Sequence, residues 1–241
     1  MLIVGFPAGP WQTNCYLVAT GEGRDCVIVD PGMDATAGIA GVVAERRLTP
    51  VAVLVTHGHL DHMWSVRPVC DEYDIPAYIH PADRHLLADP MAGMGEQTRA
   101  AFQHITGSEA DFAEPAVVRE VIEGSSVDIA DLAFRVLHNP GHTKGSVSFL
   151  LPSAQDRPQL VFTGDFLFAG SIGRTDLPSG NMDEMVESLG RVVLPMVDDT
   201  VVLPGHGETT TVGAERATNP YLRDVADQLR ERSQAISDRR L

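Results

Sequence analysis

The segment THGHLDH, residues 56–62, places three histidines and an aspartate in seven positions directly after the apolar run VAVLV. Imidazole nitrogens and carboxylate oxygens without thiolates suit zinc, iron or manganese in an open catalytic site, whereas structural zinc sites favour cysteines. A pattern of four such residues matches by chance in about one window in 10⁵ or fewer. The segment therefore predicts a metal site with the candidate ligands His57, His59, Asp61 and His62.

Three further candidates follow other strand-like runs. His142 comes after FRVLHNPG, Asp165 after LVFTG and His206 after TVVLPG. In layered α/β proteins, sites assemble where strands end, because rigid strands aim the loops there. Seven candidate ligands are enough for two adjacent metals, and a carboxylate such as Asp165 can bridge them. Asp30, which ends the run VIV, is expected to steady the histidine loop instead of binding metal.

The elements that must position these residues are short apolar runs rich in Val, Ile and Leu, which suit buried strands better than helices. Eight runs are predicted as strands: YLVA, DCVIVD, VAVLVT, AYIH, FRVLH, SVSFLL, LVFTGD and TVVLPG.

Helices are predicted at three places between or after these runs. Residues 34–47 have amphipathic spacing, and Asn181 is expected to cap a helix over 182–193, with Glu184 completing a capping box. A C-terminal helix is expected over about 219–236, with Asn219 as its cap and Pro220 at its first position. Residues 83–126 are less regular and are interpreted as an insertion of short helices and loops near the site.

Composition limits the class of protein. The 241 residues are 44% hydrophobic, which favours one domain over 1–241 with a sizeable core. Acidic residues outnumber basic ones by 33 to 18, so the formal charge of −15 disfavours a nucleic-acid partner. Three isolated cysteines, no export signal and no apolar stretch of about 20 residues predict a reduced cytoplasmic protein outside the membrane. The oligomeric state is left open.

At its candidate ligands the sequence resembles the metallo-β-lactamase superfamily, whose signature H-x-H-x-D-H stands at 57–62. The resemblance implies an α/β fold, the αβ/βα four-layer sandwich, with two mixed sheets packed together and helices on the outer faces. It also implies two metal sites that share Asp165. The first is implied to use His57, His59, His142 and Asp165, and the second Asp61, His62, Asp165 and His206.

Within the superfamily, GDFLFAGSIGRTDLPSGN and LPGHGETTTVGAERATNPYL are similar to the glyoxalase II group, the hydroxyacylglutathione hydrolases, especially its short bacterial type. An aspartate at 165, in place of a cysteine, separates the chain from the true zinc β-lactamases. Full-length glyoxalase II carries a helical C-terminal domain that grips glutathione, whereas 35 residues follow His206 here (241 − 206). The thiol carrier and the acyl group are therefore left open.

The resemblance implies a metal-dependent hydrolase that attacks 2-hydroxyacyl thioesters, such as lactoyl-glutathione, with a metal-bound hydroxide. Two divalent ions are expected, zinc first, with iron or manganese as alternatives. Asp61 and Asp165 are the expected catalytic carboxylates, with Asp61 orienting the nucleophile. Arg174 and Lys144, and also Arg216, are candidate contacts for an anionic carrier.

Two other functions remain open. Persulfide dioxygenases share the fold and a similar GRTD segment, but use one iron held by two histidines and an aspartate. A non-catalytic metal-binding or scaffold protein is the other alternative, and the complete set of ligands disfavours it.

Overall fold

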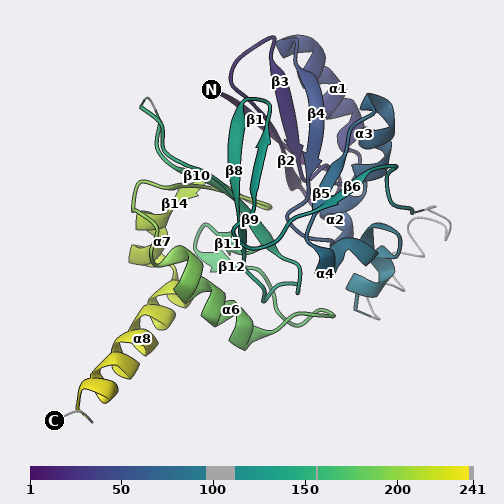
Figure 1. Ribbon diagram of the computed structural model, residues 1–241. Coiled ribbons are helices and arrows are strands. Elements are labelled where there is room, and N and C mark those ends of the chain that lie inside the picture. Colours follow the sequence, from purple (N-terminus) through teal and green to yellow (C-terminus); the bar gives the residue numbers. More distant parts are fainter. Residues whose placement is uncertain (96–111, 156, 239–241) are drawn as a thin grey trace.

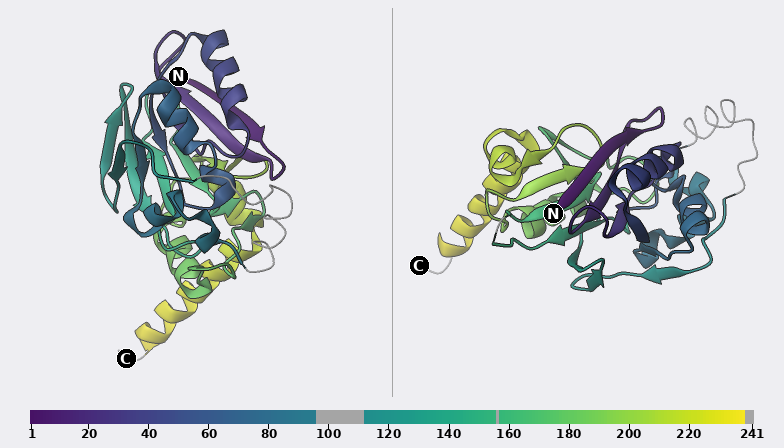
Figure 2. Two further views of the ribbon diagram at one scale, coloured as in Figure 1. Left: turned by 90° about the vertical axis from the view of Figure 1, so that its right-hand side faces the viewer. Right: turned by 90° about the horizontal axis from the view of Figure 1, so that it is seen from above.

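Two six-stranded sheets face each other in the computed structural model, and helices cover the outer side of each, so the molecule has four layers (Figures 1 and 2). The structure describes residues 1–95, 112–155 and 157–238. The predicted αβ/βα sandwich with two mixed sheets is confirmed.

The first sheet has the order β1-β2-β3-β4-β5-β6. Strands β1 to β3 pair antiparallel, and β3 to β6 pair parallel. The strands are β1 (Leu2–Ala8), β2 (Thr13–Ala19), β3 (Asp25–Val29), β4 (Thr49–Leu54), β5 (Ala77–Ile79) and β6 (Val118–Glu120).

The second sheet has the order β14-β13-β10-β9-β8-β7. Its pairs are antiparallel except β10 with β13, which run parallel. The strands are β7 (Ser126–Ile129), β8 (Leu132–His138), β9 (Val147–Leu151), β10 (Leu160–Gly164), β13 (Val201–Pro204) and β14 (Thr210–Thr211), with β11 (Leu167–Phe168) and β12 (Ser171–Ile172) forming a separate small ribbon.

Helices are divided between the two outer layers and the loops near the strand ends. They are α1 (Ala35–Arg46), α2 (Leu60–Met63), α3 (Val66–Tyr73), α4 (Pro81–Arg84), η1 (His85–Leu87), η2 (Pro90–Gly93), α6 (Met182–Ser188), the π-helical turn η3 (Leu189–Val193), α7 (Val212–Thr218) and α8 (Pro220–Asp238). Helix α8 projects away from the layers (Figures 1 and 2). None of the helices within the described ranges combines the length and hydrophobicity needed to span a bilayer.

Apolar side chains fill three layers, which explains why the central strands are continuous apolar runs. In β4, Val53 packs toward α1 and α3, whereas Ala52 and Leu54 pack between the two sheets. On the far side, Val161 of β10 packs with α6, η3, α7 and α8. Central strands are therefore buried on both faces, and their ends are held rigidly.

All eight predicted strands are present, as β2 to β5, β8 to β10 and β13. Strand β1 escaped prediction because it is an edge strand: one of its faces is partly exposed, and Gly5 and Pro7 interrupt its apolar pattern. Strand β6 escaped because it has three residues, two of them exposed.

The predicted helices over 34–47 and about 219–236 are confirmed as α1 and α8, and Asn219 Oδ1 accepts a hydrogen bond from the Tyr221 amide at 3.1 Å. Asn181 caps α6 as predicted. The capping box is wrong in its second half: the Asn181 amide donates to Gly141 O at 2.8 Å, so Glu184 has no amide there to accept. The predicted insertion over 83–126 contains η1 and η2, but also β6, and residues 96–111 lie outside the described part of the chain.

Candidate metal centre

The structure brings all seven predicted ligands to one edge of the sandwich, where strands of both sheets end. His57 and His59 follow β4, and Asp61 and His62 lie in the short helix α2. The others follow strands of the second sheet, namely His142 after β8, Asp165 after β10 and His206 after β13. The centre is therefore built from both halves of the fold.

Three histidines form the first group. Nε2 of His142 lies 3.2 Å from Nε2 of His57 and 2.8 Å from Nδ1 of His59. Each residue offers one nitrogen, and the three nitrogens lie within 4.8 Å of one another. All three side chains are buried, with at most 6% of their surface exposed.

Two histidines and an aspartate form the second group. Nε2 of His206 lies 3.1 Å from Asp61 Oδ2 and 3.3 Å from His62 Nε2. Nε2 of His62 is 3.6 Å from the same Asp61 oxygen. His62 is fully buried, whereas Asp61 and His206 are partly exposed.

Asp165 lies between the two groups. Its Oδ2 is 3.7 Å from His142 Nε2 and 3.5 Å from His206 Nε2. Its Oδ1 is 3.1 Å from His62 Nε2, yet no donor in the described part of the chain makes a hydrogen bond of good geometry to it. A buried carboxylate oxygen without a donor is what a metal ligand shows when its partner is a cation.

The spacing of the donor atoms fits divalent metals. With bonds of about 2.0–2.1 Å, the ligands of a tetrahedral ion lie about 3.3–3.4 Å apart. The contacts within and between the groups, from 2.8 to 3.7 Å, bracket that value. Nitrogens that face one another without a proton between them repel, so a shared cation would stabilise the arrangement.

The other ring nitrogens of His57 and His62 are fixed by Asp30 and Thr56. Asp30 Oδ2 accepts a hydrogen bond from His62 Nδ1 at 2.9 Å and from Thr56 Oγ1 at 2.6 Å. Because the Thr56 hydroxyl gives its proton to Asp30, it accepts one from His57 Nδ1, 3.1 Å away. Asp30 thus steadies both histidines, as the sequence predicts, and leaves each Nε2 facing the centre.

Backbone carbonyls fix two more rings. Nδ1 of His142 donates to the Arg174 carbonyl at 2.7 Å, and Nδ1 of His206 donates to the Trp11 carbonyl at 3.1 Å. Both contacts leave Nε2 as the nitrogen that faces the centre. Sequence reasoning missed these supports because any residue type can supply a carbonyl.

Electrostatics also favour a bound cation. Burial lowers the pKa of His57 and His59, with neighbouring imidazoles adding to the effect, and the pKa of His59 falls to about 3. Burial opposes charge on His62 too, but Asp165 and Asp61 raise its pKa well above the usual value. Burial likewise opposes ionisation of the two carboxylates, yet His62 holds the pKa of both below the ordinary range. A divalent ion would supply the positive charge that these carboxylates otherwise draw onto His62.

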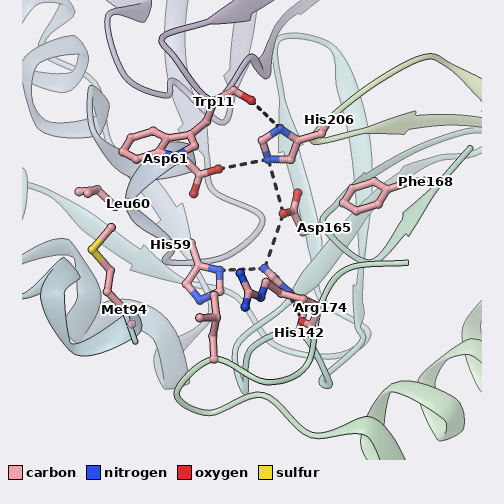
Figure 3. Close-up of a pocket in the computed structure, with 12 residues that line it drawn as sticks. Trp11, His59, Leu60, Asp61, Met94, His142, Asp165, Phe168, Arg174 and His206 are labelled. Carbon is pink, nitrogen blue, oxygen red and sulfur yellow. Dashed lines mark hydrogen bonds and ion pairs between the residues drawn. The ribbon is translucent and has the colours of Figure 1, made fainter. Parts of the chain in front are cut away.

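A pocket of about 420 Å³ opens over the metal centre (Figure 3). Five predicted ligands line it, and Trp11 and Phe168 lie on opposite sides of His206 and Asp165 (Figure 3). Its other lining residues are mostly apolar: Leu60, Gly93, Met94, Leu177 and Arg174.

The predicted substrate contacts differ in where they lie. Arg174 lines the pocket, is largely exposed and forms a two-point ion pair with Asp176 at 2.7 Å. Lys144 is exposed on the loop after His142 and does not belong to the pocket lining. Arg216 lies in α7 and donates to the Leu194 carbonyl at 2.8 Å, away from the pocket.

The chain is similar in sequence to known proteins of the metallo-beta-lactamase superfamily. A model of the metallo-beta-lactamase superfamily matches residues 8–213. The chain is 49% identical to an uncharacterized protein of Mycobacterium leprae, over 92% of this chain and 99% of that protein. It is 36% identical to the probable metallo-hydrolase YqgX of Bacillus subtilis, over 90% and 95% of the two chains. It is 30% identical to the hydroxyacylglutathione hydrolase GloC of Haemophilus influenzae, over 90% and 95%.

Solved structures of similar sequence share the fold of this chain. The B3 metallo-beta-lactamase BLEG-1 superposes with a TM-score of 0.79 at 38% identity, over 92% of this chain and 99% of that one. TTHA1623 in a di-iron-bound form gives 0.73 at 36%, over 92% and 100%. ETHE1 from Myxococcus xanthus gives 0.71 at 28%, over 91% and 84%.

Proposed function

Because this chain belongs to the metallo-β-lactamase superfamily, we propose that it is a metal-dependent hydrolase of 2-hydroxyacyl thioesters, similar to the glyoxalase II group. The observation that carries the proposal is the pair of donor groups around Asp165 at the floor of a pocket with apolar walls. The 30% identity to a hydroxyacylglutathione hydrolase supports the same reaction class.

Two divalent ions are proposed as cofactors. The first group with Asp165 would hold one, and the second group with Asp165 the other. Zinc is expected, and the relative in a di-iron-bound form supports iron as an alternative. Bound in this way, the ions would supply Lewis acidity toward a carbonyl oxygen and lower the pKa of water to about 7.

Asp61 is proposed to orient the attacking water. Its side chain is 22% exposed and lines the pocket, so a substrate can reach it. Thr13 Oγ1 donates to Asp61 Oδ2 at 3.2 Å, and His206 Nε2 lies 3.1 Å from the same oxygen. This leaves Oδ1 of Asp61 for the reacting water. A thiolate leaves without protonation by the protein, so the mechanism needs no additional acid.

The pocket walls are proposed to separate the two ends of the substrate. Apolar surface from Trp11, Met94 and Phe168 suits the acyl part and limits the access of bulk solvent to the reacting carbonyl, which the oriented water attacks. Arg174 is proposed to contact an anionic group of the thiol carrier at the rim, where its side chain is 60% exposed. Lys144 stays a weaker candidate for the same role, because it lies outside the pocket lining.

Steady-state kinetics on thioesters that share one 2-hydroxyacyl group but carry different low-molecular-weight thiols test the proposal. We expect turnover of at least one thioester to exceed that of a lactone, a phosphoester and a β-lactam by several orders of magnitude. The β-lactam is included because a B3 metallo-beta-lactamase is 38% identical. Slow rates on every thioester, with fast turnover of any of the other three, would sink the proposal.

A persulfide dioxygenase is the second candidate. The GRTD segment at 173–176 is similar to that of persulfide dioxygenases, and the chain is 28% identical to ETHE1 from Myxococcus xanthus. His57, His142 and Asp165 would provide the two histidines and the carboxylate that a single iron requires. Metal analysis after gentle purification separates the two. Two metals per chain support the hydrolase, whereas one iron with oxygen consumption on a persulfide supports the dioxygenase.

A further inference from the structure

Asp83 is a buried carboxylate that none of the roles above uses. It lies in α4, and 1% of its surface is exposed. Both of its oxygens accept hydrogen bonds: Oδ2 from the Gly58 amide at 2.9 Å and from Thr143 Oγ1 at 2.6 Å, and Oδ1 from the Gly145 amide at 2.7 Å. Three short bonds to a buried carboxylate make a rigid junction.

The three donors belong to the two loops that carry the first group. Gly58 stands between His57 and His59, and Thr143 directly follows His142. Asp83 therefore ties the loop after β4, in the first sheet, to the loop after β8, in the second. It does so one residue away from each of the three histidines.

The loop around Thr143 is arranged to meet this carboxylate. The Thr143 hydroxyl gives its proton to Asp83, so it accepts one from Ser146 Oγ, 2.9 Å away. At position 145, a Cβ atom would overlap the Asp83 carboxylate, so only glycine allows this approach. The backbone and side chains of the loop are thus fitted to Asp83.

We propose that Asp83 is a positioning residue for the first group: it sets the distance between the His57–His59 pair and His142, so that their three nitrogens can hold one cation. The inference rests on the proposed function only in requiring a metal at this group, and thioester chemistry does not enter it. His62 of the second group is bonded directly to a different buried carboxylate, Asp30, which reaches His57 of the first group only through Thr56. Loss of Asp83 should therefore affect one ion more than the other.

Glu215 provides a matched structural control. It is 2% exposed and also accepts three hydrogen bonds, from the Gly170 amide at 2.7 Å, Thr210 Oγ1 at 2.7 Å and Asn219 Nδ2 at 2.9 Å. None of its partners is next to a predicted ligand in the sequence. Its amide variant should weaken the fold in the same way as that of Asp83, without moving the first group.

The experiment titrates metal-free Asp83→Asn, Glu215→Gln and wild type with Zn²⁺ in competition with a chelator, and records the melting temperature of each metal-free protein. In Asp83→Asn, an NH₂ group replaces one acceptor and faces a donor. We expect one Zn²⁺ to bind about 10–100-fold more weakly and the other to be nearly unchanged. Glu215→Gln should lose thermal stability to a similar extent and bind both ions as wild type does.

Two further variants identify which of the two ions binds more weakly, and test whether the loss of affinity comes from misfolding. In a His206→Ala background, where the first group is intact, Asp83→Asn should weaken the remaining ion. Thr143→Val removes one of the three bonds but keeps the carboxylate, and should shift the same ion by a smaller factor.

Unchanged zinc affinity in Asp83→Asn, equal weakening of both ions, or the same effect in Glu215→Gln would overturn the inference. So would a wild-type protein that binds no ion at the first group. A protein that binds two ions, loses one in Asp83→Asn and hydrolyses no thioester would contradict the proposed function alone.

Discussion

Asp165 and His206 are both predicted ligands, but their surroundings predict that their loss has different effects on metal content and activity. Asp165 approaches histidines of both groups, whereas Nε2 of His206 contacts the second group and Asp165. We expect Asp165→Ala to lose both ions and almost all activity. His206→Ala should keep one ion and a measurable residual rate.

Metal content and kcat/KM of the two purified variants check this prediction. Circular dichroism of both controls for the fold. If His206→Ala were the more damaged in activity and in metal content, Asp165 would not be shared between the ions.

Arg174 allows the role of its side chain to be separated from that of its backbone. Its carbonyl holds His142, and this contact survives removal of the guanidinium. We expect Arg174→Ala to raise KM about tenfold with little change in kcat, because a charged hydrogen bond of about 1.5 kcal/mol to the carrier is lost equally from ground and transition states.

Asp176→Asn is the matched control, since it removes the ion-pair partner of Arg174 and keeps the cation. Its KM should not rise. A fall in kcat at constant KM in Arg174→Ala would instead assign the guanidinium to the transition state.

At the scale of residues, the sequence reveals groups that act through their side chains. His57 and Asp61 stand out because they belong to the dense H-x-H-x-D-H cluster, and His142 stands out because it follows a strand-like run. The carbonyls of Trp11 and Arg174 carry no such mark. Asp83 could not be found either, because its partners are two amides and a hydroxyl that lie 25, 62 and 60 residues away, and only the folded loops bring them together.

At the scale of elements, the turn after β13 shows how closely strands approach at the centre. The Gly205 amide donates to Gly164 O at 2.8 Å, and a Cβ atom at 205 would overlap Asp165 Oδ1 and crowd the His62 ring. We expect Gly205→Ala to destabilise the fold by about 1–3 kcal/mol and to displace Asp165. Metal affinity and activity should both fall by at least tenfold.

Gly41→Ala is the control, because alanine at this position is expected to raise stability where alanine at 205 is expected to lower it. Gly41 lies in helix α1, and nothing stands within 4 Å of where its Cβ would be. Alanine should stabilise the helix by about 0.5–1 kcal/mol and leave metal binding unchanged. Thermal melts and zinc titrations of both variants make the comparison; wild-type zinc affinity in Gly205→Ala would contradict the expected crowding.

Elements were predictable where burial is complete. The run VAVL within β4 is apolar on both faces, so length and composition reveal it. Strand β1 lies at a sheet edge, so it has no clear local pattern. The helix predicted over 182–193 is present as α6 and η3, but its spacing does not reveal that the second half is a π turn. The same double burial hides which sheet a strand joins, because no alternation of polar and apolar residues marks a face. The sandwich was therefore expected from the family resemblance and not from periodicity.

At the scale of the whole molecule, metal binding should be visible as stability. A ligand that binds only the folded chain adds about 2.7 kcal/mol at 100 times its dissociation constant. For a chain of this size that corresponds to about 5–10 °C in melting temperature. We expect a shift of this size between chelated protein and protein with added zinc, measured by differential scanning calorimetry.

His206→Ala is the control for this shift, which should become smaller as one ion is lost. Equal melting temperatures with and without zinc in the wild type would show that the donor groups hold no metal.

The centre straddles two sheets, and this arrangement has a consequence for the order of events during folding. Its closest cross-contacts join residues 83, 144 and 145 positions apart along the chain, and closing such loops is slow. The donors can therefore meet only after the two sheets have docked. We expect zinc to bind after the chain has passed the transition state for folding. Zinc should then leave the refolding rate unchanged and slow unfolding alone, which stopped-flow fluorescence of Trp11 and Trp64 can measure. Faster refolding with zinc would mean that the ions bind before the transition state and help to bring the two sheets together. An unchanged refolding rate would mean that they bind after the transition state and only stabilise the folded protein.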